Sequence, residues 1–146
     1  MLFRSALLQE GLKAEPDLIV TTHAHFSPVG QLLFRLRRIP VAVAAHGVEV
    51  WDLPESLTRR GLEAADTILP VSDYTKTRLM NELDLPEDRF QVIPDTFNPR
   101  RFSVGTAPPV LRERYGLKPS DKVLLCVSRL AASEQYKGYQ IGRAHV

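Results

Sequence analysis

Apolar and polar positions alternate with two different periods along this chain. Runs of four or five branched or apolar residues occur at 18–22, 41–45, 67–71 and 90–93. Such runs are too short for helices and are typical of buried β-strands. Between them, apolar residues recur every three or four positions, as over 29–36, which is the period of an amphipathic helix. The pattern therefore predicts strands separated by helices.

Turn and cap residues set the expected limits of these helices. We expect helices over 3–13, from Ser27-Pro28, near 55–65 and from Ser72. Serine is a favoured N-cap, and proline fits the first helical turn. Strands that recur about every two dozen residues with a helix between them are typical of a parallel sheet. The fold class predicted is α/β, a parallel sheet with helices on both faces.

The chain changes character after its fourth apolar run. Residues 98–109 are polar and rich in Pro and Gly, which indicates a linker between a first domain (1–97) and a second (110–140). The second domain is expected to begin with a helix over 110–115, ended by a glycine, and a strand over 122–127. Residues 141–146, IGRAHV, match one reading frame of a common sequencing adapter. We therefore expect the natural sequence to end before them and the chain to be a fragment of a longer protein.

Composition narrows the possible functions. Hydrophobic residues make up 44% and charged residues 25%, as in ordinary globular proteins, and no apolar run is long enough to span a bilayer. The net charge of +2 comes without a long basic run, which argues against nucleic acid as a partner. The single cysteine, Cys126, lies in an apolar run and is expected to be an inert core thiol. A lone cysteine fits a reducing compartment, so we expect a cytoplasmic protein.

Two histidines follow predicted strands. His25 comes shortly after 18–22, and His46-Gly47 comes directly after 41–45. Ligands of open α/β sheets bind at the carboxyl ends of the strands, so His46 lies where a site is expected. The alternative is that His46 is a hydrogen-bonded structural residue and that Glu49 and Trp51 anchor the loop.

A cation pair near the C-terminus suits a phosphate-bearing ligand. Arg129 follows the predicted strand 122–127, and Lys137 lies eight residues later beside Gly138. Arginine can bind phosphate oxygens through two N–H groups, lysine acts as a point charge, and glycine permits close approach of the backbone. Two solvated surface cations are the alternative explanation.

Two further alternatives rest on short segments. His23-Ala24-His25 is similar to the start of the metallo-β-lactamase signature, but Ser27 and Pro28 occupy positions where that signature has ligands, so no metal site is expected. The segment 34–38 combines apolar residues with three arginines and could contact an anionic membrane at its inner face. A core helix whose cations favour its C-terminal dipole explains the same residues.

The segments together resemble the family 4 retaining glycosyltransferases of the GT-B fold. The resemblance covers residues 16–140 and rests on five segments: PDLIVTTHAH, IPVAVAAHGVEVW, ADTILPVSDYTKTRL, FQVIPDTFNPRRF and KVLLCVSRLAASEQYKGY. It implies two Rossmann-like domains that face a cleft, of which this chain carries part of the first and the start of the second. It also implies transfer of a sugar from a nucleotide-sugar donor without a metal or cofactor.

The resemblance assigns roles residue by residue. Arg129 and Lys137, with Gly138, match the group that binds the donor diphosphate, and His46 matches a catalytic-site histidine that contacts the donor sugar. His25 and the loop that contains Gly47, Glu49 and Trp51 would face the acceptor, which could be a sugar, a lipid-linked molecule or another compound. We expect the chain to be inactive by itself. A non-catalytic α/β nucleotide-binding module and, less well supported, a degenerate metallo-β-lactamase-like hydrolase are the alternatives.

Overall fold

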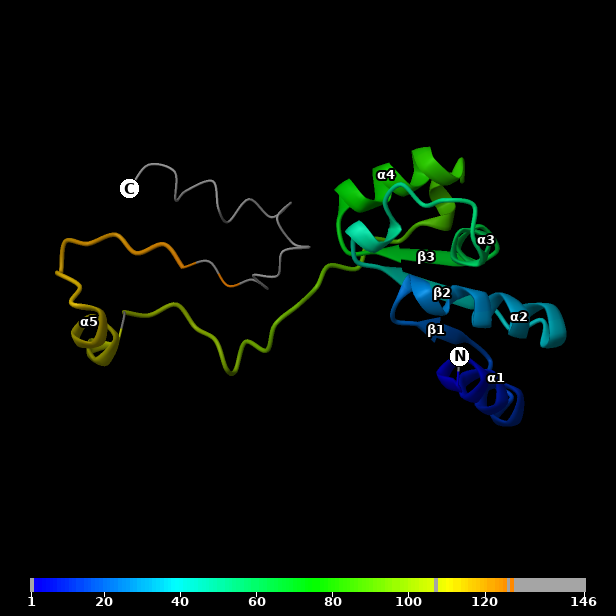
Figure 1. Cartoon of the computed structure of the whole chain (residues 1–146), viewed down its shortest axis with the longest axis horizontal. Helices are drawn as coiled ribbons and strands as arrows, with labels where there is room; N and C mark the ends of the chain where they lie inside the picture. The colour runs from blue at the N-terminus through cyan, green and yellow to red at the C-terminus, as the bar shows by residue number, and fades with distance from the viewer. Residues whose placement is uncertain (1, 107, 126, 128–146) are drawn as a thin grey trace. The chain divides into compact units, whose positions relative to one another are not determined.

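The computed structural model describes residues 2–106, 108–125 and 127, and the side chains from residue 4 onward (Figure 1). The chain divides into two units, Met1–Asn98 and Pro99–Val146. The predicted limits of the two domains and of the linker stay a prediction. Each unit is described by itself.

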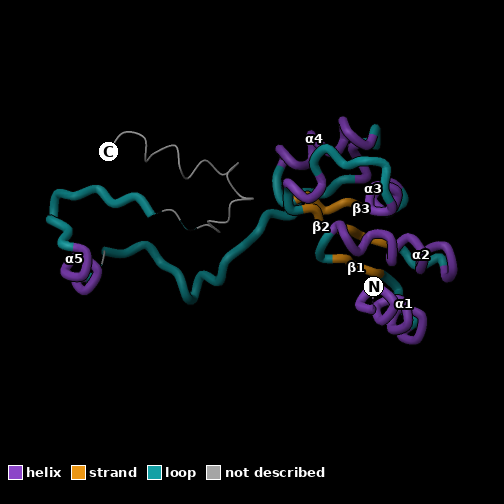
Figure 2. Tube along the Cα trace, viewed as in Figure 1, coloured by secondary structure: helices purple, strands orange, loops and turns teal. Residues whose placement is uncertain are grey.

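The first unit is built on a parallel sheet. Its strands are β1 (Ile19–Thr21), β2 (Val41–Ala45) and β3 (Thr67–Pro70), in the order β1-β2-β3 (Figure 2). The register pairs Val20 with Ala42 and Val43 with Ile68. Three of the predicted strands are therefore confirmed, and β2 has a hydrogen-bonded neighbour on each side.

The segment predicted as a fourth strand lies beside β3 without forming a full strand. Phe90 forms an isolated parallel bridge with Ile68. The N–H of Gln91 donates to the carbonyl oxygen of Ile68 at 3.0 Å, and that of Ile93 donates to Pro70 at 2.9 Å. Pro94 follows and has no N–H to continue the ladder.

Four helices accompany this sheet: α1 (Leu2–Ala14), α2 (Ser27–Arg37), α3 (Leu57–Glu63) and α4 (Asp73–Leu83). Ser72 caps α4 as predicted, because its hydroxyl accepts the N–H of Thr75 at 3.2 Å. Ser27 does not cap α2, since it is the first helical residue and Phe26 occupies the cap position. The Ser27 hydroxyl is fully buried and donates to the carbonyl oxygen of Thr58 at 3.0 Å.

The apolar core lies on one face of the sheet. Val43 and Ala45 of β2 and Ile68 of β3 belong to a single cluster with residues of α3 and α4. On the opposite face, Val20 is 54% exposed and Leu69 is half-buried, and neither is in the cluster. The prediction placed helices on both faces. Strands laid down in sequential order with right-handed crossovers place successive helices on the same face, which explains the arrangement of the described helices.

Helices α2 and α3 pack closely because a glycine lies at their contact. A Cβ atom on Gly61 would lie 2.4 Å from the hydroxyl of Ser27 and 2.6 Å from its carbonyl carbon. Any side chain at this position would therefore force the two helices apart. The contact fixes the start of α2, and with it the turn that follows β1.

Three short 3-10 helices were not predicted: η1 (Ala24–Phe26), η2 (Val48–Val50) and η3 (Glu87–Arg89). Two of them, η1 and η2, follow the carboxyl ends of β1 and β2. They therefore shape the edge of the sheet at which the predicted histidines lie.

The second unit contains α5 (Pro109–Tyr115), which ends at Gly116 with φ of 61°. This agrees with the predicted helix over 110–115. The strand predicted over 122–127 is wrong for the described part of that segment, because residues 122–125 and 127 are loop and Leu124 is fully exposed. A strand needs a hydrogen-bonded neighbour, and no described strand pairs with this segment. Cys126 lies outside the described residues.

Candidate functional site

The carboxyl ends of β1 and β2 bring three imidazole rings together. His23 and His25 follow β1, and their ring centroids lie 4.7 Å apart with the rings nearly perpendicular. The ring of His46, which follows β2, lies 6.2 Å from that of His23. Because parallel strands end at the same edge of a sheet, residues 21 positions or more apart in the chain share one site. We call these three residues the histidine edge.

His46 is held by two groups from other segments. Its Nε2 atom lies 2.9 Å from the carbonyl oxygen of Thr22, and its Nδ1 atom lies 3.7 Å from a carboxylate oxygen of Asp95. A carbonyl oxygen only accepts, so Nε2 carries a proton in this arrangement. A second proton on Nδ1 would form an ion pair with Asp95. The ring is thus oriented by the residue after β1 and by the residues that follow segment 90–93, while its side chain stays 43% exposed.

Asp95 was not among the residues predicted for the site. It follows the segment 90–93, and Pro94 is the only residue between them. The signal that selected His46, a polar residue just past the end of an apolar run, applies equally to Asp95. The sequence does not reveal that these two residues meet, because their contact depends on the order of strands in the sheet.

The loop after β2 begins with a backbone that favours glycine. Gly47 has φ of 147° and ψ of −110°, a conformation that side-chain-bearing residues rarely adopt. The carboxylate of Glu49 accepts the N–H of His46 at 2.5 Å. Glu49 therefore ties the loop back to the end of β2, as the loop-anchor interpretation expects. Its assignment to the acceptor side stays a prediction.

The side chain of Trp51 contacts two residues of α4. Its ring meets that of Tyr74 edge-to-face at 5.7 Å, and the guanidinium of Arg78 lies 4.9 Å from its centroid. Arg78 also donates to both carboxylate oxygens of Asp52 at 2.8 Å. A hydrogen bond with the Tyr74 side chain, assisted by the charge of Asp52, raises the pKa of Arg78 above its ordinary value.

A carboxylate of α4 also holds the backbone of the loop that contains Trp51 and Asp52. Glu82 accepts the backbone N–H groups of Asp52, at 3.0 Å, and of Leu53. The loop between the histidine edge and α3 is therefore held at its far end by α4. The buried indole N–H of Trp51 has no hydrogen-bond partner in the described part of the chain.

The histidine edge does not form a metal centre within residues 2–106, 108–125 and 127. No group of three or more His, Cys, Asp or Glu side chains in those ranges is placed to hold a metal ion. The Nδ1 atom of His23 is already occupied, because it accepts the backbone N–H of His25 at 3.2 Å. Ser27, at one of the positions that a metallo-β-lactamase would use, is buried against Thr58.

The predicted diphosphate-binding residues Arg129, Lys137 and Gly138 lie outside the described residues. Their role therefore stays a prediction. Among the described helices, none is long and apolar enough to cross a membrane.

The sequence model of the family described as Glycosyltransferase Family 4 matches residues 1–101, more than half of the chain. The chain belongs to glycosyltransferase family 4. The match includes the whole histidine edge and Asp95. A search of curated proteins found no match.

The fold of this family 4 chain is also similar to a solved structure. The crystal structure of Anabaena HepE (Alr3699) in complex with UDP matches this chain with a TM-score of 0.57 and a sequence identity of 19%. The similarity covers 77% of this chain and 32% of HepE, so the family 4 chain spans about a third of the length of that protein. The likeness confirms the predicted Rossmann-like α/β fold as part of a GT-B architecture.

Proposed function

We propose that this family 4 domain is part of a transferase that moves a sugar from a nucleotide-sugar donor to an acceptor with retention of configuration. Membership of the family and the position of His46 at the carboxyl edge of the sheet support this proposal. HepE was solved with UDP, which is the nucleotide that a UDP-sugar donor would leave behind. The observation that carries the proposal is the contact of His46 with both Thr22 and Asp95 in the residues that the family model matches.

The reaction breaks the bond between the anomeric carbon and the donor diphosphate and forms a bond from that carbon to an acceptor oxygen. Negative charge develops on the leaving diphosphate and positive charge on the sugar ring, while the acceptor proton passes to the leaving phosphate. Arg129 and Lys137 would stabilise the diphosphate as its charge develops, which lowers the barrier. This assignment needs no metal ion or cofactor.

His46 would position the donor sugar in this proposal. Thr22 and Asp95 fix the plane of its ring, and its exposed edge can contact a sugar hydroxyl. A histidine oriented from two sides loses little freedom when the substrate binds, which is how positioning residues contribute to catalysis. His25, Gly47, Glu49 and Trp51 would form the acceptor side of the same edge.

Calorimetric titration of the 146-residue chain tests these roles. The ligands are UDP, ADP and GDP and the corresponding glucose conjugates. We expect Arg129→Ala to weaken binding of the nucleotide and of its conjugate equally, because the diphosphate is common to both. His46→Ala should weaken only the conjugate, and His25→Ala serves as a control at the same edge. Equal binding of every ligand by all variants would contradict the assignments.

The same titration distinguishes the proposed transferase domain from the alternative, a non-catalytic nucleotide-binding module. Such a module would bind the nucleotide and its sugar conjugate with the same affinity, and His46→Ala would change neither. The second measurement is the release of nucleoside diphosphate when the chain is incubated with each conjugate and a mixture of acceptors. We expect no turnover by this chain alone, and release of nucleoside diphosphate would contradict that expectation.

A further inference from the structure

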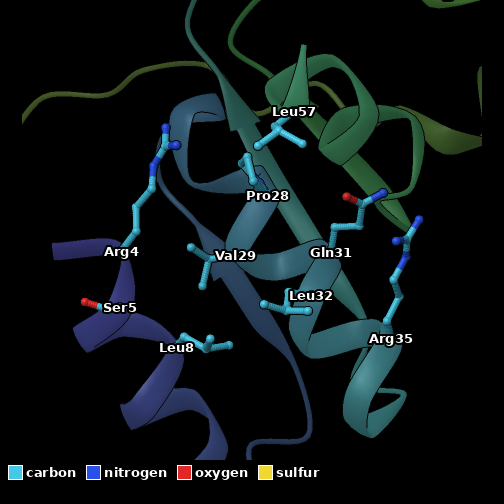
Figure 3. Close-up of a pocket in the computed structure, with 9 residues that line it drawn as sticks. All are labelled: Arg4, Ser5, Leu8, Pro28, Val29, Gln31, Leu32, Arg35 and Leu57. Atoms are coloured by element: carbon cyan, nitrogen blue, oxygen red, sulfur yellow. The ribbon is translucent and has the colours of Figure 1, made fainter. Parts of the chain in front are cut away.

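A polar groove lies between α4 and the loop that follows Trp51, and we call it the α4 groove. Its volume is about 420 Å³, within the range of roughly 300–1,000 Å³ that is typical of sites for small molecules. It is lined by Asp52, Leu53, Arg59, Arg78, Asn81 and Glu82. The groove between α1, α2 and the start of α3 is different, because Leu8 faces Val29 and Leu32 there, which makes its floor apolar (Figure 3).

The walls of the α4 groove are joined before any ligand binds. The side chain of Arg59, only 18% exposed, donates to the carbonyl oxygen of Leu53 at 3.3 Å and to that of Glu82 at 2.7 Å. The Glu82 carboxylate accepts the backbone N–H of Asp52 at 3.0 Å, so the loop and α4 are also joined at a second point. A groove built in this way loses little conformational freedom when it binds a ligand.

The polar groups of the α4 groove can both donate and accept hydrogen bonds. The Asp52 carboxylate is 86% exposed, and its charge is offset by Arg78, which donates to both of its oxygens at 2.8 Å. The exposed amide of Asn81 makes no side-chain hydrogen bond within the described residues, so its oxygen and its NH₂ group are both open to a ligand. Hydroxyl groups donate one hydrogen bond and accept two, so this set suits a neutral ligand with several hydroxyls.

An exposed aromatic ring lies beside these polar groups. Tyr74, Arg78 and Asn81 occupy positions i, i+4 and i+7 of α4 and therefore share one face of the helix. Tyr74 is 63% exposed, and its ring meets that of Trp51 edge-to-face at 5.7 Å. The face of an aromatic ring carries partial negative charge, and the C–H groups on one side of a pyranose ring carry partial positive charge. The Tyr74 ring beside hydroxyl-binding groups therefore fits a sugar ring better than an open-chain polyol.

We propose that the α4 groove is a subsite for a neutral sugar unit of an oligosaccharide acceptor. Tyr74 stacks on the sugar ring, and Asp52 and Asn81 bind its hydroxyl groups. The proposal rests on the proposed function, because a transferase acting on a glycan acceptor gives this groove its role.

The α4 groove extends away from the histidine edge. Tyr74 is in the first turn of α4, which begins just after β3 ends. Phe90 pairs in parallel with Ile68 of β3, so α4 runs back toward the amino ends of the strands. Asn81 lies two helical turns beyond Tyr74, or about 10 Å along the helix axis at roughly 1.5 Å per residue. The sugar in the groove is therefore a distal unit of the acceptor, and its binding favours an oligosaccharide over a monosaccharide.

The fluorescence of Trp51 tests the proposal, because Trp51 is the one tryptophan in the sequence and contacts Tyr74. The full 146-residue chain is titrated with maltotriose, cellotriose, mannotriose and chitotriose, with the methyl glycosides of their sugars and with sorbitol, which has hydroxyl groups but no ring. We expect a saturable change with at least one trisaccharide, weaker binding of its methyl glycoside and no change with sorbitol. No response to any trisaccharide, or an equal response to sorbitol, would overturn the proposal.

Removal of the Tyr74 ring gives the sharpest variant. Tyr74→Ala should raise the Kd of the bound trisaccharide at least about fivefold, since the stacking contact is lost, and Tyr74→Phe, which keeps the ring, should bind within about twofold of the original chain. The matched control is Tyr115→Ala in α5, since Tyr115 is 65% exposed and its ring also lies beside an arginine, Arg114, at 5.7 Å. Its Kd should be unchanged. A loss as large as that of Tyr74→Ala in either Tyr74→Phe or Tyr115→Ala would contradict the proposal.

Circular dichroism establishes that each variant keeps the helix content of the original chain. If Tyr74→Ala fails to fold, Asp52→Asn replaces it, because asparagine has a similar size and tolerates the left-handed φ of 51° at this position. Loss of the charged acceptor should raise the Kd at least about threefold. An unchanged Kd for Asp52→Asn would overturn the proposal.

These titrations contain no nucleotide, so their outcome is separate from that of the calorimetric test of the proposed function. Glycan binding without binding of any nucleotide conjugate would contradict the proposed function and leave the α4 groove as a sugar site. Binding of the conjugates without binding of any glycan would overturn the proposal for the α4 groove and leave the proposed function intact.

Discussion

Two apolar runs that the same pattern assigns to strands, 41–45 and 122–127, differ in the structure. Val41–Ala45 forms β2, where four of the five residues are buried, whereas Leu124 is fully exposed and Val123 mostly so. The same rule predicted a strand in both places. The difference is that β2 has β1 and β3 as hydrogen-bonded neighbours, and the later run has no described strand beside it.

The comparison shows what an apolar run contributes to a fold. Branched residues favour extended backbone, but the burial that stabilises a strand comes from neighbouring strands and covering helices. In the first unit, α3 and α4 complete the core around Val43 and Ile68. Equivalent substitutions in the two units should therefore differ in effect, and four pairs test this.

The largest contrast is expected between Val43→Asp and Leu124→Asp. Val43 is fully buried, so an aspartate there would place an unpaired carboxylate in the core, with a loss of about 4 kcal/mol or more in the free energy of unfolding. Leu124 is fully exposed, and its substitution should change that free energy by less than about 0.5 kcal/mol. Urea unfolding followed by circular dichroism measures both, and similar losses would show that the later run is buried in solution.

The next contrast is between Gly61→Ala and Gly105→Ala. A methyl group on Gly61 would collide with the backbone of Ser27, and such overpacking costs about 1–3 kcal/mol. A methyl group on Gly105 meets no atom within 4 Å, so no loss is expected. The same unfolding experiment gives the values. An unchanged Gly61→Ala variant would mean that α2 and α3 pack less closely than described.

Two aspartates that accept backbone N–H groups provide the third contrast. Asp66 accepts the N–H of Val41 at 2.8 Å, at the first residue of β2, and Asp121 accepts that of Lys118 at 2.8 Å in an exposed turn. Asp66→Ala leaves a buried donor unpaired and should cost about 1–2 kcal/mol. Asp121→Ala should cost less than about 0.5 kcal/mol, since water replaces the acceptor. Hydrogen exchange at the Val41 amide offers a second readout, and slow exchange retained in Asp66→Ala would contradict the assignment.

The smallest contrast depends on pH. A hydrogen bond from Lys76, followed by the charge of that residue, lowers the pKa of Glu87 below its ordinary value of 4.5. A carboxyl group whose pKa is lowered in the folded state stabilises the fold at pH values above its ordinary pKa. This contribution is lost as the pH falls through the folded-state pKa. Glu87→Gln should therefore slightly lower the Tm at about pH 7, and this difference should shrink as the pH falls below the ordinary pKa of 4.5.

The control for that experiment is Glu113→Gln in α5, since the Glu113 side chain has no ion pair among the described residues. We expect its Tm to equal that of the original chain over the same pH range. A Glu87→Gln difference that does not shrink as the pH falls would show that the Lys76 contact at 2.6 Å is not its cause.

Local signals predicted much of the first unit. The period of apolar residues located its four helices and three strands, and Ser72 marked the start of α4 correctly. The position of His46 past an apolar run also placed it at the sheet edge. These features depend on residues that are close together in the chain, so a short window of sequence contains the necessary information.

The wrong and missed predictions have one cause: contacts between residues that are far apart in the chain. Ser27 has the residue type of a cap, but its hydroxyl is drawn to Thr58, 31 positions away. Asp95 meets His46 only because segment 90–93, which lies beside β3, ends at the same edge of the sheet as β2. The sequential order β1-β2-β3 of the described sheet likewise depends on pairing between strands that are far apart in the chain.

The sequence by itself determined where the chain could be helical or extended, and it determined the resemblance to family 4 that the family model supports. Only the tertiary structure decided which apolar run became a strand, which face of the sheet the helices covered and which carboxylate met His46. The physical reason is that helix hydrogen bonds join residues four apart, whereas strand pairing and core packing join residues whose separation no local pattern specifies.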